Sequence, residues 1–313
     1  MIKVLYVGDF IKANGPSNVD ISIRNACEHL NFTDVKFIQS NETLSINTLR
    51  LFFKTDIVHV SGISFLGVLL VLLSKVFFKR TSLTTHGLLK LESQYREVSK
   101  KRILFENLLI RLVDRIFPVS PLLAKEFGSH KVTVIPNGIE RKKVSYIEKD
   151  RKLITLIGGG RKEKRHLDVC KVVAKINAAH DLGIKVSIYG EKGTDSEALN
   201  KFDFVQDFGF CPKEDIEHSL NRSNIFIQYT VFESFSLAIA EAINHGCKII
   251  ASDKVGINDY IISSPCYRVV NSQEKLEQSI LDMTMNDYEY KIDEHLLSWT
   301  QVTQEYYNNW NNL

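Results

Sequence analysis

The feature that most constrains the fold is a regular alternation between short β-rich runs and helical segments. Continuous runs of Val, Ile and Leu are typical of strands buried on both faces, as in a parallel sheet covered by helices. In the first half of the chain we predict strands at Lys3–Val7, Val35–Ile38, Ile57–Val60, Ser82–Thr85, Arg115–Val119 and Val132–Ile135, with helices such as Ser17–Leu30 and Ile103–Leu112 between them.

The same alternation restarts after a break in the middle of the chain. Pro136-Asn137-Gly138 interrupts the pattern, and Glu140–Lys152 is polar and rich in charge, which indicates a domain boundary. Beyond it we predict strands at Leu153–Ile157, Ile184–Tyr189, Ile225–Tyr229, Cys247–Ala251 and Tyr267–Val270, and helices at Leu167–Ala179, Ser236–His245 and Glu294–Trp310.

Two doubly wound α/β domains are therefore predicted. A chain of 313 residues has room for about two domains of roughly 150 residues each. We expect an N-terminal domain at 1–140, a second domain at 141–292, and a closing helix within 293–313 that packs back across the domains. Ligands bind at the carboxyl ends of the strands in open α/β sheets, so two facing sheets would place the site in the cleft between them.

Composition excludes several classes of protein. With 44% hydrophobic and 25% charged residues the chain is globular and not disordered. Its net charge of +3 is too small for a dedicated nucleic-acid binder. The five cysteines are scattered and include no Cys-x-x-Cys pair, which predicts reduced thiols in a cytoplasmic protein. The most apolar run, Phe65–Leu73, is too short to span a bilayer, which needs about 20 residues.

The strongest candidates for chemistry are Glu233 and Glu241. On one continuous helix they would lie about 80° apart. We therefore expect Glu233 in the loop after the strand at Ile225–Tyr229 and Glu241 on the helix that follows. The amides of residues 234–236 would then form an open helix N-terminus, suited to a phosphate or a hydroxyl-bearing ligand. Glu241 could accept two hydrogen bonds from a vicinal diol such as a ribose, or it could simply face solvent.

This segment, Phe232–Ala242, resembles the Glu-x7-Glu motif of retaining glycosyltransferases, chiefly glycosyltransferase family 4 (glycosyl transferases group 1), which have the GT-B fold. That fold consists of two Rossmann-like doubly wound domains that face each other across a cleft. The resemblance covers nearly the whole chain and is more specific in the C-terminal half. Further motifs of the family have counterparts in the same order, at Thr85-His86-Gly87, Val134–Ile139, Leu153–Lys164, Phe204–Phe210 and Ala251–Gly256.

The resemblance implies a binding site for a nucleotide-sugar donor, with a UDP-sugar expected. Glu241 would hold the ribose, and Arg161 and Lys164 would neutralise the diphosphate as it leaves. The alternative is that the charge run Arg161–Arg165 is a solvated loop. This loop is shorter than the family pattern and has Arg165 where Gly is common. The donor-binding residues that the resemblance implies are Arg161, Lys164, Gly209, Phe210, Ser234, Phe235, Ser236, Leu237 and Glu241.

Two residues are implied to act on the transferred sugar, His86 and Glu233. His86 follows a predicted strand, so it could equally be a strand-end histidine that the backbone satisfies. The loop Asn14-Gly15-Pro16-Ser17 resembles a Gly-Gly loop that lines the acceptor side or binds a phosphate, although Pro16 removes an amide donor. The chain has no Asp-x-Asp triplet, so metal-independent catalysis and no metal site are expected.

The excess of positive charge is local. Residues 1–140 hold 18 basic and 12 acidic side chains, a net charge of +6 that leaves −3 for the remainder. Beside the apolar Phe65–Leu73 run, a basic group would allow docking on anionic lipid, at about 1 kcal/mol per cation. The alternative is an ordinary buried helix with a basic end. The residues of this group are Lys75, Lys79, Arg80, Lys100, Lys101 and Arg102.

We therefore predict a retaining, metal-independent glycosyltransferase of the hexosyltransferase type that transfers a sugar from a nucleotide sugar to a saccharide or lipid-linked acceptor. We expect a role in bacterial surface polysaccharide assembly, in the cytoplasm or peripherally on the inner face of the cell membrane, with no cofactor and no nucleic-acid partner. The alternatives are a GT-B-fold nucleotide-sugar epimerase and a non-catalytic nucleotide-binding partner subunit. The presence of Glu233, Glu241 and His86 argues against the last.

Overall fold

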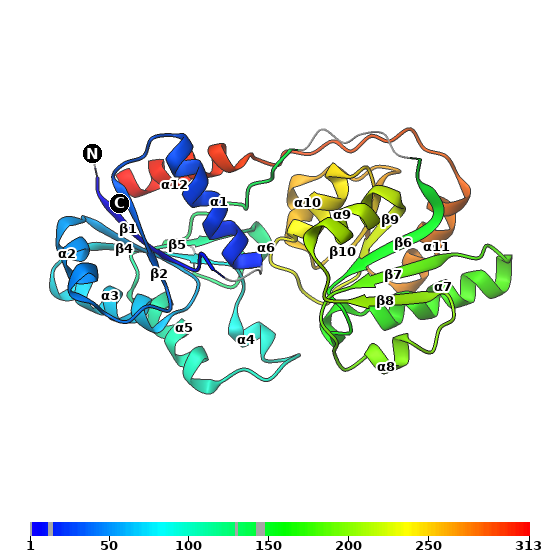
Figure 1. Ribbon diagram of the computed structural model, residues 1–313, viewed down its shortest axis with the longest axis horizontal. Helices are drawn as coiled ribbons and strands as arrows, with labels where there is room; N and C mark the ends of the chain where they lie inside the picture. The colour runs from blue at the N-terminus through cyan, green and yellow to red at the C-terminus, as the bar shows by residue number, and fades with distance from the viewer. Residues whose placement is uncertain (1, 12–14, 129–130, 142–147) are drawn as a thin grey trace. The chain divides into compact units, whose positions relative to one another are not determined.

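The structure is a computed structural model that describes residues 2–11, 15–128, 131–141 and 148–313. The chain divides into two compact units. Unit 1 contains Met1–Glu140 and Leu297–Leu313, and unit 2 contains Arg141–Leu296. Each unit is built around a parallel sheet flanked by helices (Figure 1). The α/β fold with two doubly wound sheets that the sequence predicts is confirmed.

The described part of unit 1 holds a five-stranded parallel sheet in the order β2-β1-β3-β4-β5. The strand order reverses between β1 and β3, and such a reversal opens a crevice at the carboxyl ends of the two strands. The strands are β1 (Val4–Gly8), β2 (Val35–Gln39), β3 (Ile57–Ser61), β4 (Arg80–Thr85) and β5 (Arg115–Pro118). The helices are α1 (Gly15–His29), α2 (Ile46–Lys54), α3 (Phe65–Val76), α4 (Leu89–Glu92), α5 (Lys100–Leu112), α6 (Pro121–Ala124) and α12 (Trp299–Asn311).

Unit 2 holds, within its described residues, a six-stranded parallel sheet in the order β11-β10-β9-β6-β7-β8. Here the reversal lies between β6 and β9. The strands are β6 (Asp150–Ile157), β7 (Lys185–Tyr189), β8 (Val205–Gly209), β9 (Ser223–Gln228), β10 (Lys248–Ser252) and β11 (Tyr267–Val270). The helices are α7 (His166–His180), α8 (Ser196–Leu199), α9 (Lys213–Arg222), α10 (Leu237–Asn244) and α11 (Gln273–Met285), with short 3-10 turns at Lys162–Lys164 and Gly256–Tyr260.

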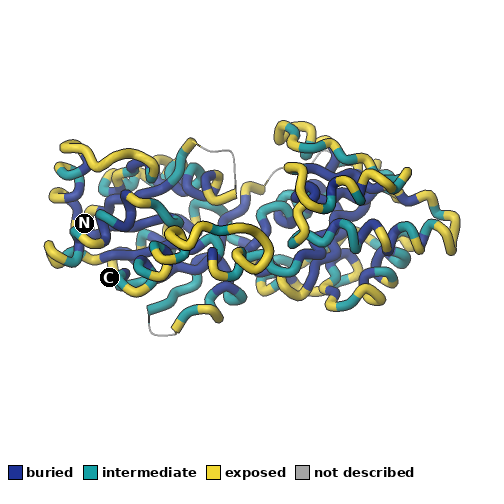
Figure 2. The backbone as a smooth tube through the Cα atoms, turned by 90° about the horizontal axis from the view of Figure 1, so that it is seen from below, coloured by how far each residue is buried: buried dark blue, intermediate teal, exposed yellow. Residues whose placement is uncertain are grey.

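The apolar side chains of the strands form a separate core in each unit. Buried segments run through the middle of each unit and exposed segments lie on the outside (Figure 2). Every residue of β9 is buried, as expected for a central strand with helices on both faces. The cores contain strand side chains such as Val7, Val60 and Leu83 in unit 1, and Leu156, Ile188 and Ile227 in unit 2.

Helix α12, at the end of the chain, belongs to unit 1 and completes its core. A capping box between Ser298 and Gln301 starts the helix. The ring of Trp310 is fully buried and lies 5.2 Å from the ring of His59 on β3. The hydroxyl of Tyr306 lies 2.9 Å from Oγ1 of Thr84 on β4. Burial of large aromatic side chains of this kind contributes several kcal/mol each, which holds the end of the chain on the sheet of unit 1.

Several predicted elements differ from the structure. Val132–Ile135 is not a strand: Val132 forms a single bridge to Ile116, and the amides of Thr133 and Ile135 donate to the carbonyl oxygens of Ile116 and Pro118 over 3.0 and 3.1 Å. Strand β6 begins at Asp150, inside the stretch that we assigned to the linker, since Asp150 pairs with Ser223 before a register shift. The last helix begins at Trp299 and not at Glu294, because Ser298 provides the N-cap.

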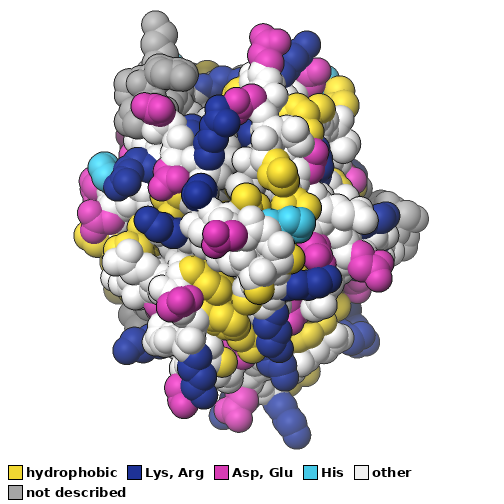
Figure 3. Space-filling model, turned by 90° about the vertical axis from the view of Figure 1, so that its right-hand side faces the viewer, with side chains coloured by type: hydrophobic (Ala, Val, Ile, Leu, Met, Phe, Trp, Pro, Cys, Tyr) yellow, Lys and Arg dark blue, Asp and Glu magenta, His cyan; other side chains and the backbone are white. Residues whose placement is uncertain are grey.

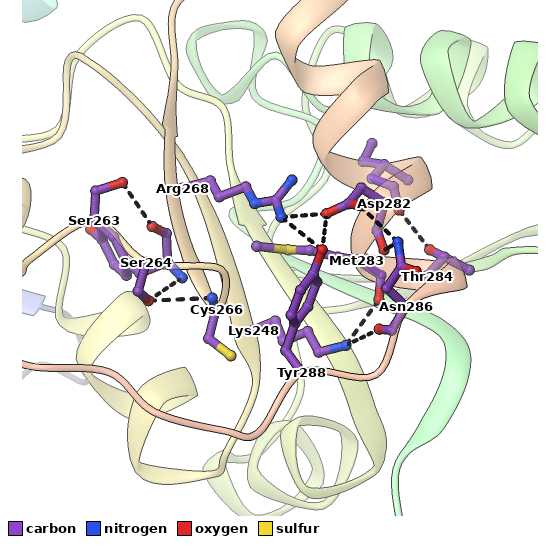
Figure 4. Close-up of polar contacts among 12 residues, drawn as sticks. Lys248, Ser263, Ser264, Cys266, Arg268, Asp282, Met283, Thr284, Asn286 and Tyr288 are labelled. Atoms are coloured by element: carbon purple, nitrogen blue, oxygen red, sulfur yellow. Dashed lines mark hydrogen bonds and ion pairs between the residues drawn. The ribbon is translucent and has the colours of Figure 1, made fainter.

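The segment after α11 is fastened to unit 2 by a polar cluster (Figure 4). The hydroxyl of Tyr288 donates to Oδ2 of Asp282 over 2.6 Å, and the guanidinium of Arg268 on β11 pairs with the same carboxylate. Lys248 donates to the carbonyl oxygens of Met283 and Asn286 over 2.9 and 3.2 Å. These contacts tie the segment to β10 and β11.

Charged side chains of both signs are interspersed on the face seen in Figure 3. The five cysteines, all of which lie in described segments, are free thiols. Within the described residues no helix combines the length and apolar character that crossing a bilayer requires.

Candidate functional site

A glycine turn at the carboxyl end of β6 begins the candidate donor site in unit 2. Gly159 has a left-handed backbone with φ of 62°, and a Cβ there would lie 1.9 Å from the carbonyl oxygen of Glu191. The amides of Gly158 and Gly159 both donate to the carbonyl oxygen of Tyr189, at 2.7 and 2.8 Å. Only glycine fits so close to this neighbouring loop. The turn therefore directs residues 161–165 toward the strand-order reversal of the sheet.

The loops that follow β6 and β9 are joined by hydrogen bonds. The carbonyl oxygen of Glu163 accepts from the amide of Val231 over 3.0 Å and from the hydroxyl of Thr230 over 2.8 Å. β6 and β9 are the neighbouring strands between which the sheet order reverses, where open α/β sheets bind their ligands. The two predicted motifs of this region are thereby brought together.

Lys164 and Glu233 meet at this point. Nζ of Lys164 lies 2.5 Å from Oε2 of Glu233, and the side chains are 11% and 24% exposed. Gln228 Nε2 also donates to Oε2 of Glu233, over 3.4 Å. The backbone of Glu233 is fixed in turn, because its amide donates to the carbonyl oxygen of Lys254 and its carbonyl oxygen accepts from the amide of Gly256, both over 2.9 Å. A largely desolvated ion pair held this firmly presents a fixed cation and a fixed carboxylate side by side.

The two arginines of the charge run, Arg161 and Arg165, have different surroundings. Nε of Arg161 donates to the carbonyl oxygen of Gly158 over 3.0 Å, and its guanidinium is half exposed beside Glu163. Arg165 has a left-handed backbone with φ of 54°, which accounts for glycine being common at this position in the family that the sequence resembles. Its guanidinium lies over the ring of Tyr229 and pairs with Asp168. Arg161 therefore faces solvent at the turn, whereas Arg165 supports the start of α7.

The N-terminus of α10 follows Glu233 directly. Ser236 is its N-cap, with φ of 90°, and its Oγ accepts from the amide of Ile239 over 3.3 Å. The first amides of a helix have no partner within the helix and favour anions. The side chain of Phe235 is buried in the core and its carbonyl oxygen accepts from Ile257, so Phe235 can meet a ligand through its amide alone. Ser234 and Leu237 lie on either side of this turn.

Glu241 lies on α10, as expected, and the structure does not bring it to Lys164. Its carboxylate lies 3.6 Å from Nζ of Lys213, at the start of α9. Both side chains are well exposed, so this ion pair contributes little to stability. The ion pair therefore places an accessible carboxylate beside the first residue of α9, the helix that follows β8. No pattern in the sequence indicates that Lys213 is the partner of Glu241.

Two of the predicted donor-binding residues, Gly209 and Phe210, lie at the end of β8 and in the turn that follows it. Gly209 adopts φ of 68°, and the side chain of Phe210 is 73% exposed. The preceding Phe208 stacks on Tyr189, with ring centroids 4.8 Å apart and the planes parallel within 1°. Exposed aromatic faces next to a tight turn suit a planar ligand such as a nucleobase.

In unit 1, His86 lies directly after β4. Its Nε2 is 2.9 Å from Oγ of Ser61, at the end of β3. Burial lowers the pKa of His86 to about 4, so the ring is neutral at physiological pH. A side-chain hydroxyl is thus a partner of Nε2.

The predicted acceptor-side loop leads into α1. Gly15 and Pro16 are the first residues of α1, where Pro is favoured because the missing amide would be unpaired within the helix. A Cβ on Gly15 would meet no atom within 4 Å, so nothing in the described residues demands glycine there. Ser17 is buried. Asn14 lies outside the described residues.

Sequence reasoning missed a buried carboxylate in unit 1. Asp20 on α1 is 2% exposed, and it accepts from the hydroxyl of Tyr6 and from the amide of Asp9, both over 2.7 Å. Burial raises its pKa to about 6. Ser61, which contacts His86, contributes to the environment of this carboxylate and lowers its pKa somewhat against the effect of burial. An acidic residue on the apolar face of the helix predicted at Ser17–Leu30 was the available signal.

Family models and solved structures match the chain. A family model described as "Glycosyl transferases group 1" matches residues 139–291, and one described as "Glycosyltransferase Family 4" matches residues 25–143. No curated protein sequence matches the chain. Several solved structures share its fold across nearly their full length.

Three of these structures illustrate the likeness. Anabaena HepE in complex with UDP and glucose is 13% identical over 100% of both chains, with a TM-score of 0.68. Sucrose-phosphate synthase from Thermosynechococcus elongatus is 14% identical over 100% of this chain and 99% of its own, also with a TM-score of 0.68. The lipopolysaccharide outer core galactosyltransferase WaaB is 15% identical over 99% and 98% of the two chains, with a TM-score of 0.65. Because the two family models together match residues 25–291 and the fold is shared end to end, the chain belongs to the group 1 glycosyltransferases with the GT-B fold.

Proposed function

We propose that the chain is a retaining glycosyltransferase of family 4 and hexosyltransferase type that uses a UDP-sugar donor and needs no metal. The observation that carries the proposal is the Lys164–Glu233 pair at the strand-order reversal of unit 2. The complexes of Anabaena HepE with UDP and with UDP-glucose support the choice of UDP. The likeness to WaaB supports a saccharide or lipid-linked acceptor in bacterial surface polysaccharide assembly.

The chemistry follows from where charge develops. As the bond between the sugar and the diphosphate breaks, the diphosphate gains negative charge, and fixed cations stabilise that state more than the ground state. Lys164 would turn from Glu233 to the diphosphate, and Arg161 and the amides at the start of α10 would add to the positive potential. These groups supply the charge compensation that the leaving group needs. Glu233, released from Lys164, would accept hydrogen bonds from hydroxyls of the transferred sugar.

The remaining donor contacts fit the same proposal. The exposed carboxylate of Glu241 would bind the two ribose hydroxyls, displacing Lys213. Gly209 and Phe210 would lie beneath the base. In unit 1, the neutral ring of His86 would hydrogen-bond to the transferred sugar, and Gly15, Pro16 and Ser17 would line the acceptor side.

A donor panel tests the proposal. The protein is incubated with individual nucleotide sugars and acceptor, and released nucleoside diphosphate is measured together with the anomeric configuration of the product. We expect UDP release without added metal that is unchanged by a chelator and lost in Glu233→Ala. Glu277→Ala on α11, which removes the exposed partner of Lys175, is the matched control and retains activity. An isomerised donor without diphosphate release would indicate an epimerase, and tight binding without turnover a nucleotide-binding subunit.

We also propose that unit 1 docks on the anionic inner face of the membrane. The structure alters the expected basic group, because Lys75 pairs with Asp114 over 2.7 Å and Lys79 donates to the carbonyl oxygen of Thr55. The structure also places exposed aromatic residues beside these lysines. Phe78 is 94% exposed, and the half-exposed rings of Phe53 and Phe77 lie 5.0 Å apart.

Basic side chains next to exposed aromatic rings suit the interface of an anionic bilayer. Arg80 lies beside this surface. Helix α5 begins with Lys100, Lys101 and Arg102. Positive side chains at a helix N-terminus are repelled by the positive end of the helix dipole, and a nearby anion would relieve this repulsion. Flotation with anionic and with neutral liposomes tests the proposal. We expect binding to anionic liposomes that salt weakens and that Phe78→Ser reduces. Absence of binding to anionic liposomes would overturn it.

A further inference from the structure

The amide side chain of Gln228 contacts the carboxylate of Glu233 at the end of β9. Gln228 is the last residue of β9 and is 3% exposed, and its Nε2 lies 3.4 Å from Oε2 of Glu233. An ionised carboxylate can only accept hydrogen bonds, so the NH2 group of Gln228 and not its carbonyl oxygen must face Glu233. Gln228 lies outside the sequence motifs that predict the donor site.

The backbone of Gln228 is held by neighbouring strands. Strand β9 lies between β6 and β10 in the sheet of unit 2, and Gln228 is in register with Ala251 on β10. Every residue of β9 is buried. A functional group on a strand is held more precisely than one on a loop, and Glu233 belongs to the loop that follows β9. Gln228 is therefore a fixed point from which the position of the Glu233 carboxylate can be set.

Both contacts of the Glu233 carboxylate use the same oxygen. Nζ of Lys164 lies 2.5 Å from Oε2, the oxygen that Gln228 also faces. Within the described residues no hydrogen bond reaches Oε1 of Glu233. The side chain is 24% exposed. One oxygen of the carboxylate is thus held by the protein, and the other is left for a ligand.

Binding of a diphosphate would change this balance. If the diphosphate draws Lys164 away, Gln228 is the remaining donor to Glu233 in the described part of the chain. A carboxylate that has lost its counter-charge in a place mostly removed from water is costly. Gln228 supplies a hydrogen bond but no charge, so the carboxylate still gains from further donors. The hydroxyl groups of a sugar are donors of this kind.

We propose that Gln228 is a positioning residue that holds Oε2 of Glu233 when Lys164 binds the diphosphate, so that Oε1 receives a hydroxyl of the transferred sugar. This inference rests on the proposed function and deepens it. A cation in place of Gln228 would neutralise Glu233 and weaken its attraction for the sugar. An apolar side chain would let the carboxylate rotate. The neutral amide fixes the carboxylate and leaves its charge in place.

The experiment compares two ligands that differ only in the sugar. The full chain is titrated by calorimetry, without acceptor, with UDP and with UDP-glucose, which is replaced by another UDP-sugar if the donor panel favours one. Gln228→Met keeps the size of the side chain and removes its donor. We expect it to weaken binding of the UDP-sugar by about 3–10-fold, the effect of one hydrogen bond, and to leave binding of UDP unchanged.

A double-mutant cycle separates positioning from a general loss of structure. In a chain that carries Glu233→Ala, Gln228→Met should cost no further affinity for the UDP-sugar, because the carboxylate that Gln228 holds is absent. Asn224→Leu is the matched control. Asn224 is a buried amide at the other end of β9, and it donates to the carbonyl oxygens of Arg151 and Met283 over 3.1 and 3.3 Å. Its loss should lower stability and leave the ratio of the two affinities unchanged.

The outcomes separate this inference from the proposed function. Equal weakening of UDP and the UDP-sugar by Gln228→Met, or the same cost with and without Glu233, would overturn the positioning role alone. If Gln228→Met fails to fold, Gln228→Asn replaces it, since this variant keeps a buried amide that is too short to reach Glu233 and should show the same loss. A wild-type chain that binds neither ligand would overturn the proposed function and this inference together.

Discussion

Lys164 and Glu233 form an ion pair with Nζ 2.5 Å from Oε2, although 69 residues separate them in the chain. They come from the loops after β6 and β9, which are neighbours in the sheet of unit 2. Each charge compensates the other in a place that is mostly removed from water, where an unpaired charge is costly. The pair therefore keeps a cation and a carboxylate ready at the point where an anionic ligand is expected.

The first prediction concerns the cation. Lys164→Met should lower kcat by about 100-fold or more, because one fixed charge that stabilises the leaving group is lost. Steady-state kinetics with the active donor measure this effect. Lys162→Met, two residues away and exposed, is the control and should change kcat little. Equal losses in the two variants would contradict a specific role for Lys164.

The second prediction separates donor binding from chemistry. Glu241→Ala should raise KM for the nucleotide sugar by about 10–100-fold, as expected for loss of hydrogen bonds to a charged group. kcat should change much less, because the ribose lies away from the bond that breaks. Lys213→Met removes the partner of Glu241 and should leave KM unchanged or lower it. A fall in kcat with KM unchanged in Glu241→Ala would reject the ribose role.

The third prediction concerns the backbone of the glycine turn. Gly159→Ala should destabilise unit 2 by several kcal/mol, because its φ of 62° is strained for alanine and the new Cβ would lie 1.9 Å from a carbonyl oxygen. Urea unfolding followed by circular dichroism measures the change. Gly15→Ala, where the space is open, should leave stability almost unchanged. A Gly159→Ala protein as stable as the wild type would contradict this prediction, because it would show that the loops at Gly159 and Glu191 can move apart without loss of stability.

The fourth prediction is a loss of stability in acid. Burial lowers the pKa values of His59 and His166 to about 3 and that of His86 to about 4. The unfolded chain therefore binds more protons than the folded chain below pH about 6.5, so the free energy of unfolding falls as the pH drops from about 6.5 toward 4. Asp20 acts in the opposite sense, because its raised pKa makes the folded chain bind a proton between about 6 and 4.

Urea unfolding at several pH values checks this balance. Each histidine adds up to one proton to the uptake on unfolding, which is a slope of up to about 1.4 kcal/mol per pH unit, and Asp20 subtracts up to the same amount. His166→Gln should reduce the slope by about 1.4 kcal/mol per pH unit. A free energy of unfolding that is flat from pH 6.5 to 4 would contradict the burial of these neutral rings.

The sequence determined the fold class. Mainly apolar runs such as Ile57–Val60 and Ile225–Tyr229, each with one polar residue, favour strands buried on both faces, and the helices between them require parallel connections. The two glutamates were also placed correctly, one in a loop and one on a helix, because local capping signals fix the start of α10. Local patterns of this kind act within a few residues, so they can be read directly from the chain.

Only the tertiary structure decided which side chains meet. Lys164 pairs with Glu233 and Glu241 with Lys213 because of the strand order, which the local pattern does not encode. Asp20 on α1 likewise meets Tyr6 on β1, and Ser61 at the end of β3 meets His86 after β4. The energy of a buried polar group depends on partners that come from distant parts of the chain, and those partners are set only when the sheet has formed.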